Sequence, residues 1–190
     1  MPERPVLLLV TGLPGSGKST LAERVAPRLD APVLGWDWVM GSLTPFEPIQ
    51  ATLRAMGHIE HRGVGWALLW QVARAQLRRG QSVVVDGVAR AEETAGTRRV
   101  AAECGARPLV VMTTCPDEAE HRRRIEGRDR AIPGWHELTW DDVQGTRARF
   151  EPPGDVDLVL DTRDDLDAAV VAVVALATAP ARTTSPAPGR

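Results

Sequence analysis

Apolar positions along the chain fall into two kinds of segment that alternate with each other. Short apolar runs, of the kind buried on both faces of a parallel sheet, predict five strands, at residues 6–11, 32–35, 82–86, 108–113 and 156–161. Between the runs, apolar residues recur at steps of three and four and predict amphipathic helices, at residues 18–29, 60–80, 91–104, 117–127, 139–149 and 164–178. This order predicts an α/β fold in three layers, α/β/α, around a five-stranded parallel sheet.

Three stretches interrupt the alternation. Prolines and glycines break up residues 41–59, so an irregular segment is expected there and 41–62 is a candidate lid over a substrate. Residues 128–138 hold a Pro-Gly pair and form a second candidate lid. Residues 179–190 are rich in Ala, Pro and Thr and are predicted to be a disordered tail. We therefore expect a single domain over residues 1–178.

Lys18 is the one lysine among 190 residues, and the other 22 of the 23 Lys and Arg side chains are arginines. It completes a match to the phosphate-binding pattern G-x-x-x-x-G-K-[ST], which stands between an apolar strand and a helix, as that loop requires. The glycines let backbone N–H groups turn toward an anion. Lys18 is expected to reach the β- and γ-phosphates and the Ser19 hydroxyl to hold Mg²⁺. Candidate nucleotide contacts are Gly12, Pro14, Gly15, Ser16, Gly17, Lys18, Ser19 and Thr20.

Composition and charge narrow the class of protein. The net charge is −2 and the pI is about 6.1, which argues against a nucleic-acid partner, since such proteins usually carry a basic balance. Cys104 and Cys115 lack metal-ligand spacing and are expected to be reduced thiols of a cytoplasmic protein. Residues 6–10 are too short for a signal peptide and 170–179 for a membrane span, so no membrane partner is expected. The oligomeric state is left open.

Two aspartates follow predicted strands, at the edge where ligands of parallel sheets bind. Asp37 follows the second strand, which we expect next to the phosphate-binding loop, and there it would orient or deprotonate an acceptor hydroxyl. The alternative for Asp37 is an N-cap of the helix that begins at Trp38. Asp86 closes the third strand and would hold Mg²⁺ or contact the acceptor, and the alternative is a satisfied strand-end carboxylate.

Two further segments carry a resemblance to a known family. Residues 85–90 look like the D-G-x-x-R segment of adenylate kinases, and residues 116–128 look like their P-D-E…R-I-x-G-R segment with one extra residue. Over most of its length the chain therefore resembles the small kinases of the nucleoside monophosphate kinase-like, or AAA_33, superfamily. The resemblance implies a P-loop NTPase architecture that binds ATP, with Arg124 near the adenine, Arg128 at the ATP phosphates and 128–138 as the ATP lid.

Residues 121–130 hold five arginines at the end of a predicted helix and in the loop that follows. Arginines in that place would close over the transferring phosphoryl group and stabilise its charge. The alternative is a solvated basic helix end that interacts favourably with the helix dipole.

The acceptor side departs from adenylate kinases. No second arginine set for a nucleotide phosphate follows the second strand, and Asp37 stands there instead. An acid at this place is similar to chloramphenicol phosphotransferase, polynucleotide kinase and zeta-toxin-like kinases, which phosphorylate hydroxyls. Arg90 would touch an acceptor phosphate in adenylate kinases, and its role here is open. Candidate acceptor contacts are Asp37, Trp36, Trp38, Asp86 and Arg90.

Six tryptophans are present without a tyrosine. Trp36 and Trp38 flank Asp37, and one is expected to face the cleft and the other the core. Trp66 and Trp70 share a helix face, where core packing is the expected role and lining a cleft is the alternative. Four basic side chains before and within the start of that helix are typical of a solvated surface and would otherwise contact acceptor groups: Arg54, His58, His61 and Arg62.

These observations predict an ATP- and Mg²⁺-dependent phosphotransferase that moves the γ-phosphate to a hydroxyl of a small molecule, such as an antibiotic, a nucleoside or a sugar-like compound. Lys18, Asp37 and Arg128 are the candidate catalytic residues. One alternative is a polynucleotide 5′-hydroxyl kinase, and another is a nucleotide-binding ATPase switch without an acceptor. A guanine-specific Asn-Lys-x-Asp segment is excluded, since the chain has no second lysine.

Overall fold

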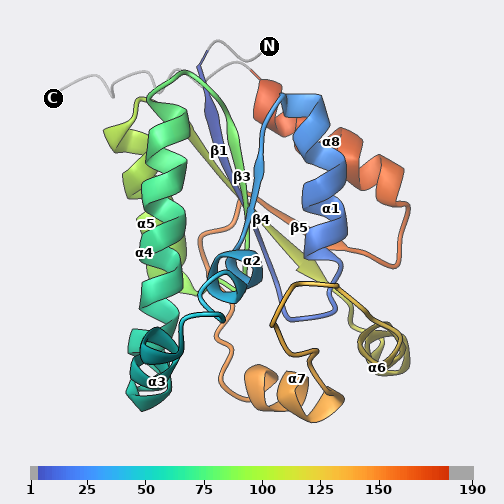
Figure 1. Cartoon of the computed structure of the whole chain (residues 1–190). Coiled ribbons are helices and arrows are strands. Elements are labelled where there is room, and N and C mark those ends of the chain that lie inside the picture. Colours follow the sequence, from blue (N-terminus) through green and yellow to red (C-terminus); the bar gives the residue numbers. More distant parts are fainter. Residues whose placement is uncertain (1–3, 180–190) are drawn as a thin grey trace, which may run out of the picture.

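Five parallel strands form one sheet in the computed structural model, which describes residues 4–179 (Figure 1). The order across the sheet is β2-β3-β1-β4-β5. The predicted α/β class and the five-stranded parallel sheet are therefore confirmed. The strands are β1 (Val6–Thr11), β2 (Val33–Gly35), β3 (Val83–Asp86), β4 (Arg107–Thr114) and β5 (Leu158–Asp161).

Helices cover both faces of the sheet, which gives the three predicted layers. Helices α1 and α8 pack on one face, and α4 and α5 pack on the other (Figure 1). The helical elements are α1 (Lys18–Val25), the short 3-10 helix η1 (Ala26–Leu29), α2 (Trp36–Gly41), α3 (Glu47–Ala55), α4 (His58–Leu77), α5 (Ala91–Glu103), α6 (Glu118–Glu126), α7 (Trp140–Arg147) and α8 (Leu166–Thr178).

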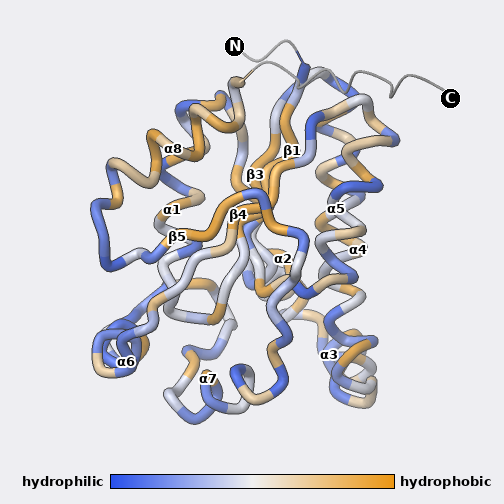
Figure 2. The backbone as a smooth tube through the Cα atoms, turned by 180° about the vertical axis from the view of Figure 1, so that it is seen from behind, coloured by the Kyte–Doolittle hydropathy of each residue, from blue (hydrophilic) through white to orange (hydrophobic). Residues whose placement is uncertain are grey.

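The continuous apolar run of β1 is explained by its central place in the sheet. Side chains of a strand alternate between the two faces, so Leu8 and its even-numbered neighbours face α1 and α8, whereas Leu7 and Leu9 face α4 and α5. All of them are fully buried, and burial of one such side chain stabilises the fold by about 1.5–3 kcal/mol. Figure 2 shows this hydrophobic centre, with hydrophilic residues gathered on α6 and α7.

The segment predicted to be irregular, 41–59, contains a helix. Helix α3 spans nine residues, and Pro48 lies in its first turn. The missing N–H of a proline is no loss there, because the first-turn N–H groups have no partner within a helix. Proline was thus taken as a breaker where it begins a helix, and the irregular assignment is wrong for Glu47–Ala55, while residues 42–46 are turns and coil.

The expected position of the second strand is also wrong. Strand β2 pairs with β3, and β3 lies between β2 and β1. In the register of these strands, Asp86 stands opposite Val10 of β1 on one side and Gly35 of β2 on the other. The carboxylate next to the phosphate-binding loop is therefore Asp86, while Asp37 lies one strand farther away.

The C-terminal tail, the two cysteines and the apolar helices were also the subject of predictions. The predicted disordered tail, 179–190, falls outside the described residues except for Ala179. Cys104 and Cys115 are both unpaired thiols, and Cys115 is buried. Within residues 4–179 no helix combines the length and the apolar composition that crossing a bilayer requires.

Candidate functional site

The phosphate-binding loop, residues 12–17 and called the P-loop below, joins β1 to α1 at the carboxyl edge of the sheet. Gly12 has φ 141°, and a Cβ there would lie 2.3 Å from the carbonyl oxygen of Thr113. Gly15 has φ 81°, and a Cβ there would lie 2.9 Å from the ring of His121. Both glycines are required by the close approach of neighbouring elements as well as by their left-handed backbone.

Helix α1 begins in a way that suits an anion. Its N-cap, Gly17, offers no side-chain capping bond, and the first turn contains no acidic residue. The first N–H groups of a helix have no internal partner, and the helix dipole adds positive potential to them. Phosphate oxygens would satisfy these donors, as they do at other helix N-termini.

Lys18, the first residue of α1, carries a buried ammonium with 7% of the residue exposed. Burial lowers the pKa of Lys18 to about 8, Asp86 raises it, and Arg128 and Arg130 lower it again. Among the residues that the structure describes, no carboxylate lies within 4.0 Å of this ammonium. A triphosphate would supply the missing negative charge.

Hydroxyl groups on the ends of β4 and β5 hold the P-loop in place. The hydroxyl of Ser16 lies 2.7 Å from that of Thr113, which donates to the carbonyl of Thr11 at 3.1 Å. The hydroxyl of Thr162 donates to the carbonyl of Ser16 at 2.9 Å. The Ser16 side chain is thus used inside the protein, and only its backbone remains for a nucleotide. Thr113 and Thr162 were missed because their pairing with the loop is long-range in sequence.

His121 fixes the P-loop from the side of α6. Its Nε2 lies 2.6 Å from the carbonyl oxygen of Pro14, and Arg147 of α7 donates to its Nδ1 at 3.0 Å. Burial is the largest cause that lowers the pKa of His121, which favours the neutral ring with the proton on Nε2. The sequence indicated no separate role for His121 within the 121–130 segment, whereas this residue is 1% exposed, so the alternative of a solvated basic helix end does not hold for it.

Two cavities adjoin at the P-loop. The first, called the P-loop cavity, has a volume of about 660 Å³. It is lined by P-loop and α1 residues together with Trp38, Arg124, Arg128, Arg130 and Thr162. The second, called the strand-end cavity, has a volume of about 580 Å³ and lies where β3 and α2 meet α4 and α7. Three side chains line both cavities: Lys18, Arg128 and Arg130.

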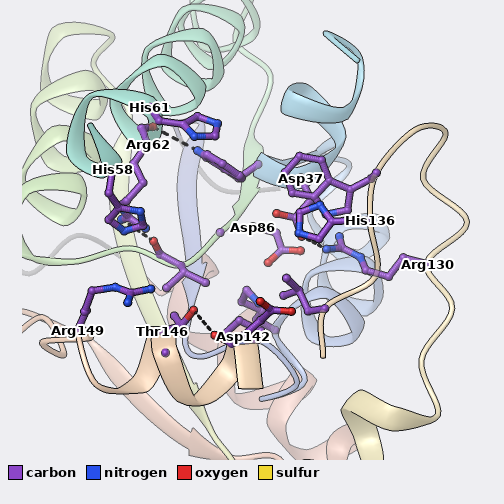
Figure 3. Close-up of a pocket in the computed structure, with 18 of the residues that line it drawn as sticks. Asp37, His58, His61, Arg62, Asp86, Arg130, His136, Asp142, Thr146 and Arg149 are labelled. Carbon is purple, nitrogen blue, oxygen red and sulfur yellow. Dashed lines mark hydrogen bonds and ion pairs between the residues drawn. The ribbon is translucent and has the colours of Figure 1, made fainter. Parts of the chain in front are cut away.

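Asp37 lies in the first turn of α2 and lines the strand-end cavity. The N-cap of α2 is Gly35, so Asp37 does not cap this helix, and that alternative is wrong. The carboxylate forms an ion pair with Arg130, and their side chains are 25% and 12% exposed. Figure 3 shows the side chains of Asp37 and Arg130 pointing toward each other at the edge of the cavity. Arg130 was part of the predicted arginine cluster but was not singled out.

Asp86 ends β3 and is 5% exposed. Its Oδ1 is buried without a hydrogen-bond partner in the described residues, so the alternative of a satisfied strand-end carboxylate is wrong. Within the same range no three acidic, His or Cys side chains gather as a metal site of their own. Mg²⁺ is usually held by one or two carboxylates plus substrate phosphates. Asp86 lines the strand-end cavity and Ser19 the P-loop cavity, and both carry the oxygen donors that such a site needs.

The tryptophans divide between the two cavities and the core. Trp36 lines the strand-end cavity edge-on to Trp135, with ring centroids 5.9 Å apart, and its indole N–H donates to the carbonyl of Arg62. Trp38 is 52% exposed and lines the P-loop cavity, whereas Trp36 also packs against the core, so the expectation that one of the pair faces a cleft and the other the core is confirmed in part. Trp66 is 1% exposed and belongs to the core as predicted, with one edge on the strand-end cavity.

The other candidate arginines occupy distinct places. Arg124 lines the P-loop cavity and donates to the Thr162 hydroxyl and to Glu120, both at 2.7 Å. Arg128 lines both cavities, and burial lowers its pKa. Arg90 lines the strand-end cavity, where its Nε is buried without a partner in the described part of the chain.

The two predicted lids differ in what they contribute. Residues from 128–138 line both cavities. Of the other predicted lid, 41–62, His58, His61 and Arg62 line the strand-end cavity, at the start of α4, and no other residue of this segment lines either of the two cavities. The wall of the strand-end cavity opposite α4 comes from α7 and the residues beside it. The sequence predicted this helix but did not place it at the site.

Comparison with known proteins identifies related chains. A model of the AAA_33 family, described as an AAA domain, matches residues 7–153. A curated relative, a probable adenylyl-sulfate kinase of Aeropyrum pernix, is 29% identical over an alignment of 170 residues, and the match covers 86% of this chain and 86% of the relative.

Solved structures share the fold. The crystal structure of APE1195 has a TM-score of 0.69 and 27% identity, and the match covers 92% of this chain and 96% of that one. A gluconokinase from Sinorhizobium meliloti 1021 has a TM-score of 0.65 and 23% identity, with 91% and 94% covered, a likeness that shows the fold alone. The chain therefore has a P-loop kinase-like fold and belongs to the AAA_33 family.

Proposed function

We propose that this protein is an ATP-dependent phosphotransferase that moves the γ-phosphoryl group to a hydroxyl of a small molecule. The observation that carries the proposal is the junction of the two cavities. The P-loop cavity suits a nucleotide, the strand-end cavity suits an acceptor, and Lys18, Arg128 and Arg130 line both. Positive side chains at such a junction would stabilise charge on a phosphoryl group passing from one cavity to the other.

The nucleotide would bind in the P-loop cavity. Its phosphates would accept from the backbone N–H groups of the P-loop and from Lys18, and Arg124 would lie toward the base. Mg²⁺ would be held by the Ser19 hydroxyl and Asp86, and when bound it neutralises charge on the β- and γ-phosphates.

The acceptor hydroxyl would bind in the strand-end cavity beside Asp37. The acceptor oxygen forms a bond to the γ-phosphorus while the bond from that phosphorus to the β–γ bridging oxygen breaks, and ADP leaves. The hydroxyl proton passes to the Asp37 carboxylate and then to solvent. Arg130 would turn from Asp37 toward the phosphoryl group, since its guanidinium lines both cavities.

Two observations support a small acceptor over a switch without one. A nucleotide switch has no need of a second cavity of about 580 Å³ beside the P-loop, and that volume lies within the usual range for small-molecule sites. The curated relative is named as an adenylyl-sulfate kinase, a small-molecule kinase by name.

An acceptor screen tests the proposal. The protein is incubated with ATP and Mg²⁺ and, one at a time, nucleosides, sugars, aminocyclitols and hydroxylated antibiotics. We expect at least one compound to raise ATP consumption well above the rate without acceptor and to gain one phosphate by mass spectrometry. Equal ATP consumption with and without every compound would contradict the transfer and favour the switch.

The lowered pKa of Lys18 predicts how ATP affinity depends on pH. Below about pH 8 the ammonium is charged and ready for the phosphates, whereas above it the free protein must take up a proton to bind. We expect the Kd for ATP to rise by up to about tenfold per pH unit above that value. Calorimetric titrations between about pH 6 and about pH 10 measure this, with Lys18→Met as a control that should bind weakly at every pH. A Kd that stays constant across the range in the parent protein would contradict the assignment.

A further inference from the structure

Basic side chains gather at one end of the strand-end cavity. They come from three separate elements: His58 and Arg62 from the first turns of α4, Arg90 from the N-cap of α5, and Arg149 from the segment after α7. In Figure 3 His58, Arg62 and Arg149 lie on one side of the cavity, and Asp37 and Arg130 lie on the other. These four basic residues, His58, Arg62, Arg90 and Arg149, are called the basic cluster below.

Of the three arginines in the basic cluster, two lack a protein counter-ion in the described residues. Arg62 is held by Glu93 at 2.8 Å and donates to the carbonyl of Val88 at 2.9 Å, so its position is fixed. Within residues 4–179, by contrast, neither Arg90 nor Arg149 has a carboxylate within 4.0 Å, and the Nε of Arg90 is buried without any acceptor. Leaving a buried N–H donor without an acceptor costs free energy, and a ligand that accepts a hydrogen bond from the Nε of Arg90 would recover that cost.

Four carboxylates line the cavity, those of Asp37, Asp86, Asp141 and Asp142, and in the described part of the chain none of them lies within 4.0 Å of a basic-cluster side chain. Asp37 forms its ion pair with Arg130, and Asp142 accepts from the Thr139 hydroxyl at 2.7 Å. Asp86 acts on Lys18, whose pKa it raises. Around His58, burial has the largest effect and lowers its pKa, and Arg62, Arg149, Arg90 and His61 lower it further. The potential at this end of the cavity is therefore positive.

The space between the cluster and Asp37 is aromatic. Trp36 and Trp66 line it, and Trp135 packs edge-on against Trp36. Flat apolar side chains of this kind contact rings and carbon skeletons well. The cavity is thus lined by the Asp37 carboxylate, by tryptophan rings and by the basic cluster.

We propose that the acceptor carries an anionic group, a phosphate, sulfate or carboxylate, which Arg90 and Arg149 bind while Asp37 orients the hydroxyl at the other end of the same molecule. The proposal rests on the proposed function and narrows its substrate class. Guanidinium groups bind these anions through paired N–H donors. Arg62 adds positive potential, and its ion pair with Glu93 holds it in place, whereas the lowered pKa of His58 favours a neutral ring that can donate or accept a hydrogen bond.

Matched acceptor pairs test this proposal. Each pair shares one carbon skeleton and differs only in whether the anionic group is present, with phosphate, sulfate and carboxylate as separate arms. The variants are Arg90→Gln and Arg149→Gln, and the control is Arg99→Gln, an exposed arginine of α5 that lines neither cavity. We expect the anionic member of a pair to be preferred by the parent protein, and each variant to lower kcat/KM for it by about 10–100-fold, mainly through KM.

The neutral member of a pair should change by less than about threefold in either variant. A preference for neutral acceptors, or an equal loss for both members, would overturn the proposal while leaving phosphoryl transfer intact. If no compound of any kind is phosphorylated, the proposed function itself fails. A direct binding measurement then still tests whether the basic cluster binds an anion. For that measurement inorganic sulfate is titrated into protein whose P-loop is saturated with a non-hydrolysable ATP analogue. Saturable binding lost in Arg90→Gln and Arg149→Gln but kept in Arg99→Gln supports the cluster, and no saturable binding in the parent protein overturns it.

Discussion

Replacing Lys18 with alanine is expected to abolish phosphoryl transfer, lowering kcat/KM by at least about 10³-fold. Lys18 is the one lysine in the chain and lines both cavities, so no neighbouring lysine can take its place. The positive charge of Lys18 would interact with the ATP phosphates in the ground state and with the transferring phosphoryl group during the reaction. Steady-state kinetics with an acceptor found in the screen, together with ATP titrations, measure both parts of the loss.

The fold of Lys18→Ala should be intact, which separates chemistry from stability. Holding a buried ammonium whose pKa is lowered from 10.5 to about 8 costs the folded state roughly 3 kcal/mol. Removing the three extra methylenes loses about 2 kcal/mol of burial. Because the two effects nearly cancel, Tm should stay within a few degrees of the parent, as it should for Arg28→Ala, an exposed control on η1. Transfer retained in Lys18→Ala would show that the P-loop assignment is wrong.

Replacing Asp37 with asparagine is expected to cut transfer by roughly 10²-fold or more while leaving the Kd for ATP within about tenfold. Asparagine keeps the size of the side chain and still accepts from Arg130, but it cannot take a proton from the acceptor hydroxyl. The P-loop cavity does not include Asp37, so nucleotide binding should change only through Arg130. Asp164→Asn, which changes an acid outside both cavities, is the matched control.

Loss of ATP binding in Asp37→Asn would instead make the carboxylate a structural anchor for Arg130. Arg130→Gln separates the two roles, because it removes the ion-pair partner and keeps the carboxylate. If Asp37 is the proton acceptor, the pH profile of kcat should change in Asp37→Asn and keep its shape in Arg130→Gln.

The parts of the fold that the sequence predicts correctly depend on residues close together along the chain. The apolar run of β1, the glycine loop and the step-of-four residues of α1 specify a strand, a turn and a helix within about 25 residues, and each boundary has a chemical reason. Asp86 could be placed at the carboxyl edge because it ends a run of valines. Such features depend on neighbours in sequence, which a single chain shows directly.

The order of strands and the walls of the cavities could not be predicted in the same way. Whether β2 or β3 pairs with β1 depends on contacts between residues more than 70 positions apart, which no periodicity encodes. The ion pair of Arg130 with Asp37 spans 93 positions, and nothing in the spacing distinguishes Arg130 from the other arginines of its cluster. Helix α7 was predicted as an element, but its place against α6 and the strand-end cavity is set by packing alone.

The single buried lysine offers one site for selective chemical labelling in this protein. With a pKa of about 8, roughly a tenth of Lys18 is the neutral, nucleophilic amine at pH 7, whereas an ordinary lysine is almost wholly protonated there. An amine-directed reagent small enough to enter the cavity would therefore modify one side chain of this chain, apart from the α-amino group. The extent of that labelling, read as a mass shift on one peptide, reports directly how fully the P-loop is occupied.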